Sequence, residues 1–152
     1  EQTDKIIEAI NRIINKSHKL KLIVIYIKNE FKQSIILDIV TKGALKEGTI
    51  GAEIDPRIKI INNNIYVKHI MDSFSNAKLD KFLIKNRVNH IYFTGLDAKY
   101  CVDKTVQAAF NRGYKISVIR DAIASSSDKD RDDKLEEFEQ MGAYVITVDE
   151  LL

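Results

Sequence analysis

The sequence is poor in the residues that punctuate or cross-link a chain: its 152 residues include one Cys, one Pro, six Gly and no Trp. So few prolines and glycines exclude a collagen-like or low-complexity chain. A single cysteine excludes an internal disulfide and fits a reducing cytoplasm. An excess of charge of one sign is lacking too, because 24 Lys and Arg face 22 Asp and Glu. We therefore expect no nucleic-acid partner and no anionic membrane partner. No apolar run reaches the roughly 18 residues that a membrane-spanning helix needs.

What the chain does contain is a regular alternation of helix and strand patterns without repeats or linkers, so we expect one domain over residues 1–152. Apolar residues recur at helical spacing over residues 6–14. Residues 22–27 form a continuous apolar run, typical of a strand buried on both faces. Residues 28–57 hold many turn residues, with a short helix expected near residues 35–40.

The second half of the chain has a clearer order. Two short apolar runs flank Asn62–Asn64, which predicts a small hairpin formed by residues 58–61 and 65–67. Helices then alternate with strands at residues 90–94, 115–119 and 143–147. This order predicts an α/β fold with a mainly parallel sheet. Such sheets bind ligands at the carboxyl ends of their strands, so a functional site is expected just after Ile27, Val67 and Thr94.

The one cysteine lies at such a place. Cys101 follows Gly95 by six residues and begins the helix expected over residues 99–112. Backbone N–H groups and the helix dipole stabilise a thiolate at this position, and the thiolate is the nucleophilic form. The alternative is that Cys101 is a small apolar residue packed under a helix. The strand-end position favours the nucleophile.

Partners for the thiol are less evident. The three histidines are scattered, and His90 is interpreted as a structural strand residue. No two His or Cys share the spacing of metal ligands, so no metal is expected. Lys68 ends the run 65–67 and is either a solvated strand end or a cation at the mouth of the site. The residue pattern alone favours the solvated alternative.

The chain contains residues 94–102 (TGLDAKYCV) followed by 105–114 (TVQAAFNRGY), and before them Val67-Lys68 with Asp72-Ser73-Phe74. Residues 48–57 (GTIGAEIDPR) and 121–125 (DAIAS) lie on either side of these segments. Together, and in this order along the chain, the segments resemble one family, the isochorismatase-like cysteine hydrolases. Residues 94–102 and 105–114 are similar to its nucleophile segment, and Val67-Lys68 with Asp72-Ser73-Phe74 is similar to its lysine segment.

This resemblance implies a three-layer α/β/α, Rossmann-like domain without a cofactor, which assembles as a dimer or tetramer. It implies a triad of Asp, Lys and Cys, with Cys101 as the nucleophile and Lys68 as the triad lysine. It also implies a non-proline cis peptide between Leu96 and Asp97, with the N–H groups of Asp97 and Cys101 as the oxyanion hole. The presence of Cys101 favours the amidase branch of the family, which cleaves a C–N bond of a small amide or ureide through a thioester.

The sequence departs from the family in two ways. No position matches the triad aspartate, which ends the first strand of the family. We favour loss of that strand from the given sequence over a degenerate member. If the chain is complete, Asp97 is the nearest substitute carboxylate. Residues 27–31 contain no His, which argues against a zinc-dependent nicotinamidase.

Strand-end positions also suggest residues that contact substrate. Glu30 is a candidate polar contact, and Phe31, Phe74 and Tyr100 are candidates for an apolar wall, with plain core packing as the alternative for each aromatic ring. The sequence thus predicts a cytoplasmic cysteine hydrolase. The alternative is a catalytically degenerate homologue that binds a small molecule or a protein.

Overall fold

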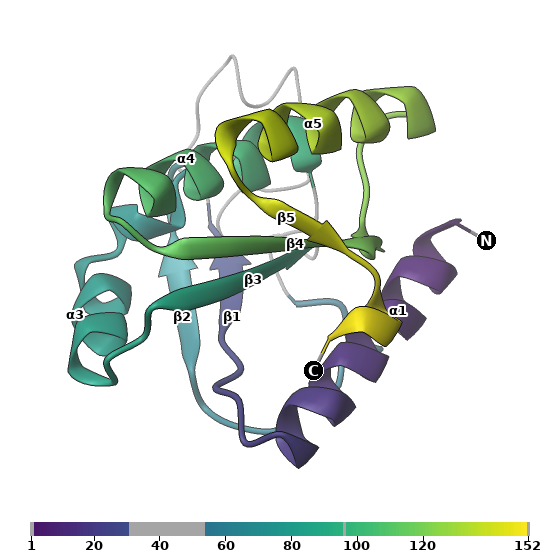
Figure 1. Cartoon of the computed structure of the whole chain (residues 1–152). Coiled ribbons are helices and arrows are strands. Elements are labelled where there is room, and N and C mark those ends of the chain that lie inside the picture. The colour runs from purple at the N-terminus through teal and green to yellow at the C-terminus, as the bar shows by residue number, and fades with distance from the viewer. Residues whose placement is uncertain (1, 31–53, 96, 152) are drawn as a thin grey trace.

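The computed structural model describes residues 2–30, 54–95 and 97–151 (Figure 1). Its helices and strands follow the alternating order expected from the sequence. In chain order they are α1 (Gln2–Lys19), β1 (Tyr26–Asn29), β2 (Ile65–Lys68), α3 (Ala77–Lys85), β3 (His90–Gly95), α4 (Asp103–Asn111), β4 (Lys115–Ile123), α5 (Asp128–Met141) and β5 (Tyr144–Ile146). Three short turns complete them: 3₁₀ turns at Ser73–Ser75 and Val148–Glu150, and a π-helical turn at Ala98–Val102.

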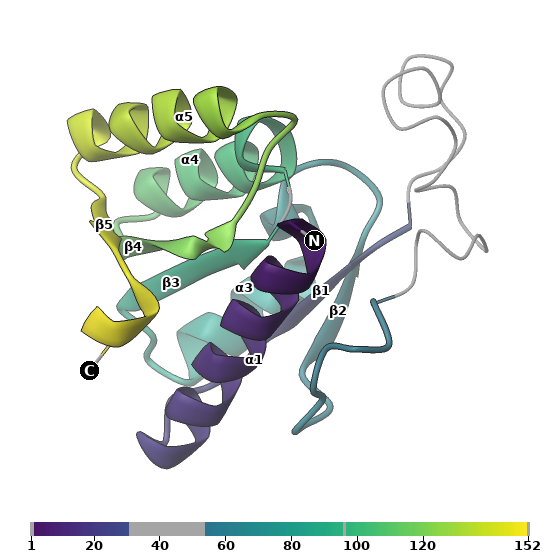
Figure 2. The ribbon, with the colours of Figure 1, turned by 90° about the vertical axis from the view of Figure 1, so that its right-hand side faces the viewer.

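The strands form two parallel groups. β1 pairs with β2, and β3, β4 and β5 pair in that order. Helices α4 and α5 cover one face of the β3–β4–β5 sheet and α1 lies on the opposite face, as Figure 2 shows. The expected α/β class, with parallel strands between two helical layers, is confirmed.

Local sequence signals explain why the helices begin and end where they do. In α5, the Ser127 hydroxyl accepts a hydrogen bond from the Asp130 N–H at 3.0 Å, which caps the helix start. The helix ends at Gly142, whose φ of +107° is a left-handed conformation that favours glycine. In α1, the apolar residues at helical spacing form the buried face, including Ile6, Ile13 and Ile14.

Two expectations for the first half of the chain were wrong. The strand expected over residues 22–27 begins only at Tyr26, because its parallel ladder starts where Tyr26 meets Ile65. The hairpin does not form: residues 65–68 pair with β1 instead, and the Tyr26 hydroxyl holds the preceding segment by donating to the Lys59 carbonyl at 2.8 Å. The helix expected near residues 35–40 lies outside the described residues.

The larger core cluster lies beneath α4 and α5. Its most buried side chains come from α4, α5 and the central strand β4, and include Val106, Phe138, Ile116 and Val118. A smaller cluster joins α1 to β4 and the carboxyl-terminal turn through Ile13, Ile119 and Val148. These clusters fix β4, and β4 in turn holds β3 and the turn that follows it.

Candidate active site

The last residues of three strands meet at one cavity. Asn29 ends β1, Lys68 ends β2 and Gly95 ends β3, and all three line a cavity of about 980 Å³ together with Cys101. These are the strand ends at which the sequence placed the site. The cavity therefore gathers residues that are far apart in the sequence at one edge of the parallel strands.

Cys101 lies in the π-helical turn between β3 and α4, with 9% of its surface exposed. The turn is defined by the Val102 N–H, which donates to the Asp97 carbonyl five residues earlier at 3.0 Å. Asp97 caps its start, because Asp97 Oδ1 accepts from the Lys99 N–H at 2.9 Å and from the Ser125 hydroxyl at 2.6 Å. π-helical turns recur at functional sites. Here one presents the single thiol of the chain to the cavity.

Lys68 is buried beside this thiol, with 4% of its surface exposed. Its Nζ donates a hydrogen bond to the Met71 carbonyl at 2.6 Å. Burial lowers the pKa of Lys68, while its interactions with Cys101 and Asp72 act in the opposite direction. The solvated alternative for Lys68 therefore does not hold, and its side chain lies beside that of Cys101.

The lysine turn and the cysteine turn are also joined by buried hydroxyls. The Ser73 N–H donates to Thr105 Oγ1 at 3.0 Å, and the hydroxyls of Ser73 and Thr105 lie 3.1 Å apart. Thr105 belongs to the first turn of α4, and Ser73 begins the 3₁₀ turn after β2. Neither was expected from the sequence to act in the site, because their contact depends on the fold.

The other candidate residues are divided between the cavity and the surface. Phe74 lines the cavity, and its ring packs between Tyr114, with centroids 6.0 Å apart, and the Arg112 guanidinium at 4.4 Å. Tyr100, 39% exposed, and Glu30, paired with Lys28 at 2.9 Å, are not among the lining residues. Phe31 and Leu96, and with Leu96 the expected cis peptide, lie outside the described residues.

The sequence did not single out Asn29. Its Oδ1 atom is buried and has no hydrogen-bond partner in the described structure. In the parallel register of β1 and β2, Asn29 is the partner of Lys68. The sequence feature that could have identified Asn29 is its position two residues after Ile27, at an expected strand end.

The cavity continues from the strand ends along β1 and β3. Ile27 of β1 and Ile25 just before that strand line it on one side, and Ile91 and Phe93 of β3 line it on the other. Residues of α1 and α3, Ile10 and Leu83 among them, line it as well. Within the described residues, β1 pairs only with β2 and β3 only with β4. A long apolar slot thus lies between two strands that are each paired on one side.

His90 lines this cavity at the start of β3. Its ring stacks on Tyr92 with centroids 4.2 Å apart, and its Nε2 lies 2.8 Å from the Ser117 hydroxyl. Burial, followed by the charge of Lys115, lowers the pKa of His90. These contacts fit the structural interpretation of this histidine. The described residues contain no group of three or more His, Cys, Asp and Glu that could hold a metal ion.

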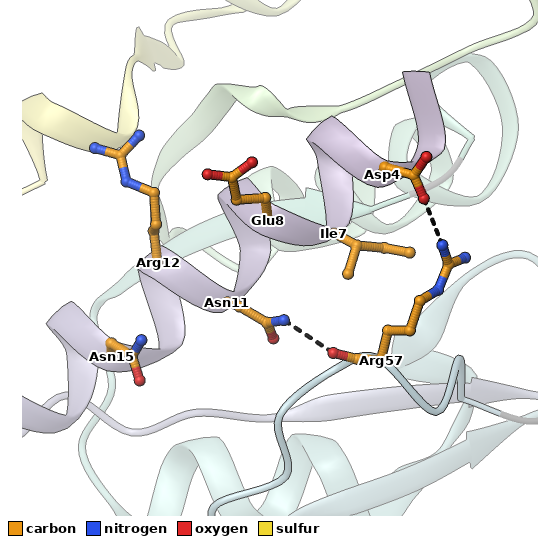
Figure 3. Close-up of a pocket in the computed structure, with 7 residues that line it drawn as sticks. All are labelled: Asp4, Ile7, Glu8, Asn11, Arg12, Asn15 and Arg57. Atoms are coloured by element: carbon orange, nitrogen blue, oxygen red, sulfur yellow. Dashed lines mark hydrogen bonds and ion pairs between the residues drawn. The ribbon is translucent and has the colours of Figure 1, made fainter. Parts of the chain in front are cut away.

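A second, shallower pocket of about 450 Å³ lies on the outer side of α1 (Figure 3). Arg57 closes it by pairing with Asp4 at 2.6 Å, and Asn11 donates to the Arg57 carbonyl at 2.9 Å. Neither Cys101 nor Lys68 lines this pocket.

None of the helices in the described part of the chain is long and apolar enough to cross a membrane.

Comparison with known proteins supports the resemblance seen in the sequence. The family model described as the isochorismatase domain matches residues 1–150. An uncharacterized isochorismatase family protein of Bacillus subtilis, YddQ, is 31% identical over 80 residues, which are 52% of this chain and 44% of that protein. The chain spans about half the length of the curated relatives that it matches.

Two solved structures cover nearly the whole chain. An isochorismatase-like hydrolase from Alkaliphilus metalliredigens has a TM-score of 0.86 at 20% identity, over 99% of this chain and 84% of that one. An N-carbamoylsarcosine amidase from Thermoplasma acidophilum has a TM-score of 0.81 at 27% identity, over 99% and 86%. The first shows the fold, and the second adds a somewhat higher sequence similarity.

Proposed function

Because this chain belongs to the isochorismatase family, we propose that it is a cysteine hydrolase that cleaves a C–N bond of a small amide or ureide. One observation carries the proposal: the single thiol, Cys101, lies beside the buried ammonium of Lys68 in a cavity at the strand ends. A nearby cation stabilises a thiolate, the form that attacks a carbonyl. The similarity to an amidase supports the choice of reaction.

The proposed reaction has two halves. In the first, the Cys101 thiolate forms a C–S bond with the substrate carbonyl carbon, and the carbonyl electron pair moves onto oxygen. Collapse of this intermediate breaks the C–N bond, and the nitrogen leaves as a neutral amine with the proton that the thiol gave up. In the second half, water attacks the thioester, a C–O bond forms and the C–S bond breaks. The products are a carboxylic acid and the free thiol.

The oxyanion of each half-reaction needs hydrogen-bond donors. We assign this role to the N–H groups of Asp97, which precedes the π-helical turn, and of Cys101, which lies in it. The lysine is assigned an electrostatic role, because its side chain interacts with that of Cys101. No metal or cofactor is part of the proposal.

A carboxylate that moves the proton is still required, and we place it on a strand in the slot between β1 and β3. Three observations support a strand there. Each neighbouring strand is paired on one side only among the described residues. Helices α1 and α3 both supply apolar residues to the slot. Gln2 and Thr3 line the same cavity, so a parallel strand that leads into α1 would end near Lys68.

The test is a panel of primary amides and ureides, with ammonia release as the readout and mass spectrometry of the protein for the acyl intermediate. We expect release to depend on Cys101 and the adduct to map to it. Cys101→Ala should abolish both and leave the circular dichroism spectrum and the Tm unchanged. Ammonia release by folded Cys101→Ala would overturn the proposal. Saturable binding of the same amides by an inert thiol would identify the non-catalytic alternative.

A further inference from the structure

The two residues after β4, Ala124 and Ser125, hold the segment that leads into the cysteine turn. The Ala124 N–H donates to the Gly95 carbonyl at 3.2 Å, and the Ala98 N–H donates to the Ala124 carbonyl at 2.9 Å. The Ser125 hydroxyl donates to Oδ1 of Asp97 at 2.6 Å. Asp97 is therefore held through its own side chain and through residues before and after it in the chain.

Asp97 in turn holds the backbone of the proposed nucleophile. Its carbonyl accepts from the Tyr100 N–H at 3.2 Å and from the Val102 N–H at 3.0 Å, and these two residues flank Cys101. A displacement of Asp97 therefore moves the peptide groups on either side of Cys101. Ser125 and Cys101 line the same cavity, whereas Asp97 does not. Ser125 is thus connected to the backbone of Cys101 through Asp97.

The Asp97 carboxylate needs such an anchor because it carries a negative charge next to the site. Its Oδ1 has two donors, the Ser125 hydroxyl at 2.6 Å and the Lys99 N–H at 2.9 Å. A hydroxyl that donates to a carboxylate makes one of the stronger hydrogen bonds in proteins. Without it, the carboxylate is free to turn toward the N–H groups that the oxyanion needs, where the two negative charges repel each other.

We propose that Ser125 is a positioning residue for the oxyanion: its hydrogen bond to Asp97 keeps the N–H groups of Asp97 and Cys101 aligned on the substrate carbonyl oxygen. This inference rests on the proposed function, which assigns those two N–H groups to the oxyanion. Such donors act at about 2.7–3.1 Å from the developing charge, so a small displacement of the turn lowers the rate.

Two reagents separate the oxyanion from the thiol without knowledge of the natural substrate. p-Nitrophenyl acetate acylates a thiolate: the C–S bond forms, the carbonyl electron pair moves onto oxygen and returns, and p-nitrophenolate leaves with the C–O bonding pair. Iodoacetamide alkylates the same thiolate without an oxyanion, because the S–C bond forms as iodide leaves with the C–I bonding pair. Neither step needs a proton donor.

The measured quantity is the acylation rate constant of Cys101 divided by its alkylation rate constant, which we call the oxyanion ratio. Division cancels any change in the nucleophilicity of the thiol itself. Rates measured in Cys101→Ala are subtracted first, which removes acylation of lysines. The same ratio for glutathione is the reference, because glutathione has no fixed donors for an oxyanion.

We expect the oxyanion ratio of the unaltered protein to exceed that of glutathione, and Ser125→Ala to lower it on the order of tenfold at an unchanged alkylation rate. Ser125→Thr keeps the hydroxyl and should retain the ratio. Ser126→Ala is the matched control, because the Ser126 hydroxyl also donates to a carboxylate at 2.6 Å, that of Asp130 in α5. This control should leave the ratio unchanged. An unchanged ratio in folded Ser125→Ala would overturn the inference.

A double-mutant cycle tests whether Ser125 acts through Asp97. Asp97→Ala removes the same hydrogen bond from the other side and should also lower the oxyanion ratio, which keeps the test decisive if Ser125→Ala does not fold. In the Asp97→Ala background, Ser125→Ala should have no further effect, because the hydroxyl has already lost its acceptor. Effects of the two substitutions that multiply would contradict the inference.

Failure of the inference and failure of the proposed function give different results. An oxyanion ratio equal to that of glutathione in the unaltered protein would overturn the inference and leave Cys101 as the nucleophile. Reaction of Cys101 with neither reagent would overturn the proposed nucleophile, and the inference with it.

Discussion

The hydroxyl of Thr105 lies 3.0 Å from the carbonyl oxygen of Cys101, four residues earlier in the chain. The hydroxyl oxygen of Thr105 also accepts a hydrogen bond from the Ser73 N–H. Ser73 lies two residues after Met71, whose carbonyl accepts from the Lys68 side chain. One buried hydroxyl therefore joins the backbone of the cysteine turn to the backbone of the lysine turn. The relative positions of thiol and ammonium depend on this junction.

Thr105→Val should loosen that junction, because valine has nearly the same shape and no hydroxyl. Buried groups of Ser73 and Cys101 lose their partner, so we expect the free energy of unfolding to fall by about 1–3 kcal/mol. We also expect slower alkylation of Cys101 by iodoacetamide. Thr105→Ser keeps the hydroxyl and should restore most of the rate. A Thr105→Val protein that is less stable and alkylates at the unaltered rate would limit Thr105 to a purely structural role.

Lys68 should make stability depend on pH in a defined direction. Its pKa is lowered by burial from the ordinary 10.5, so the unfolded chain binds more protons between the lowered value and 10.5. The contribution of Lys68 to the free energy of unfolding therefore rises as pH increases through this window. Lys68→Met removes the dependence and should be the more stable protein at neutral pH, because no charge is buried.

Urea unfolding of the unaltered protein and of Lys68→Met, from neutral to alkaline pH, measures the contribution of Lys68 as the difference between their free energies of unfolding. Lys68→Arg is the matched control, since a guanidinium stays charged over the whole range. The free energy of unfolding of the unaltered protein should approach that of Lys68→Met as pH rises. The free energy of unfolding of Lys68→Arg should differ from that of Lys68→Met by a constant amount. A constant difference for the unaltered protein would mean that Lys68 keeps its ordinary pKa.

Variants of Asp97 distinguish two roles for this residue. It either substitutes for the triad aspartate or only caps the π-helical turn. Its Oδ1 accepts from the Lys99 N–H and the Ser125 hydroxyl, so Asp97→Ala should cost about 1 kcal/mol of stability. Asp97→Asn keeps an oxygen acceptor and should keep most of that stability. If Asp97 only caps the turn, Asp97→Asn also keeps amide turnover. Loss of turnover with retained stability would instead identify Asp97 as the proton carrier.

The slot between β1 and β3 should bind an extended peptide. A peptide of about six residues, with apolar side chains at alternate positions and Asp at its carboxyl end, matches the length of a typical strand. We expect saturable binding, measured by fluorescence anisotropy of the labelled peptide, and acceleration of ammonia release. The same peptide ending in Asn should bind and give no acceleration. Equal binding by a peptide of the same composition without the alternation would argue against a strand in the slot.

The sequence predicted the helices and the later strands well because their signals are local. The cap at Ser127, the glycine at position 142 and the apolar spacing of α1 act within a few residues of the chain. Strand pairing is not local. The run 22–27 has the composition of a strand buried on both faces, but ladder partners decide where a strand begins, and Ile65 meets Tyr26.

The same distinction between local and non-local signals applies to the residues of the site. Cys101, Lys68 and Phe74 follow strand ends in motifs that the sequence displays, and the structure brings them to one cavity. Tyr100 stands next to Cys101 in the chain, yet the π-helical turn leaves it on the surface. The buried, unpaired Oδ1 of Asn29 is a property of its surroundings, because nothing in the sequence shows that a side chain will lack a partner in the described structure.

Among the described residues, β1 and β3 are each paired on one side only, and this also bears on solubility. An apolar strand whose N–H and C=O groups lack a neighbour is a template for pairing with another molecule, and proteins keep such edges covered. Ile23, beside β1, is 46% exposed. A segment that covered these edges would therefore also remove a surface through which copies of this chain could aggregate.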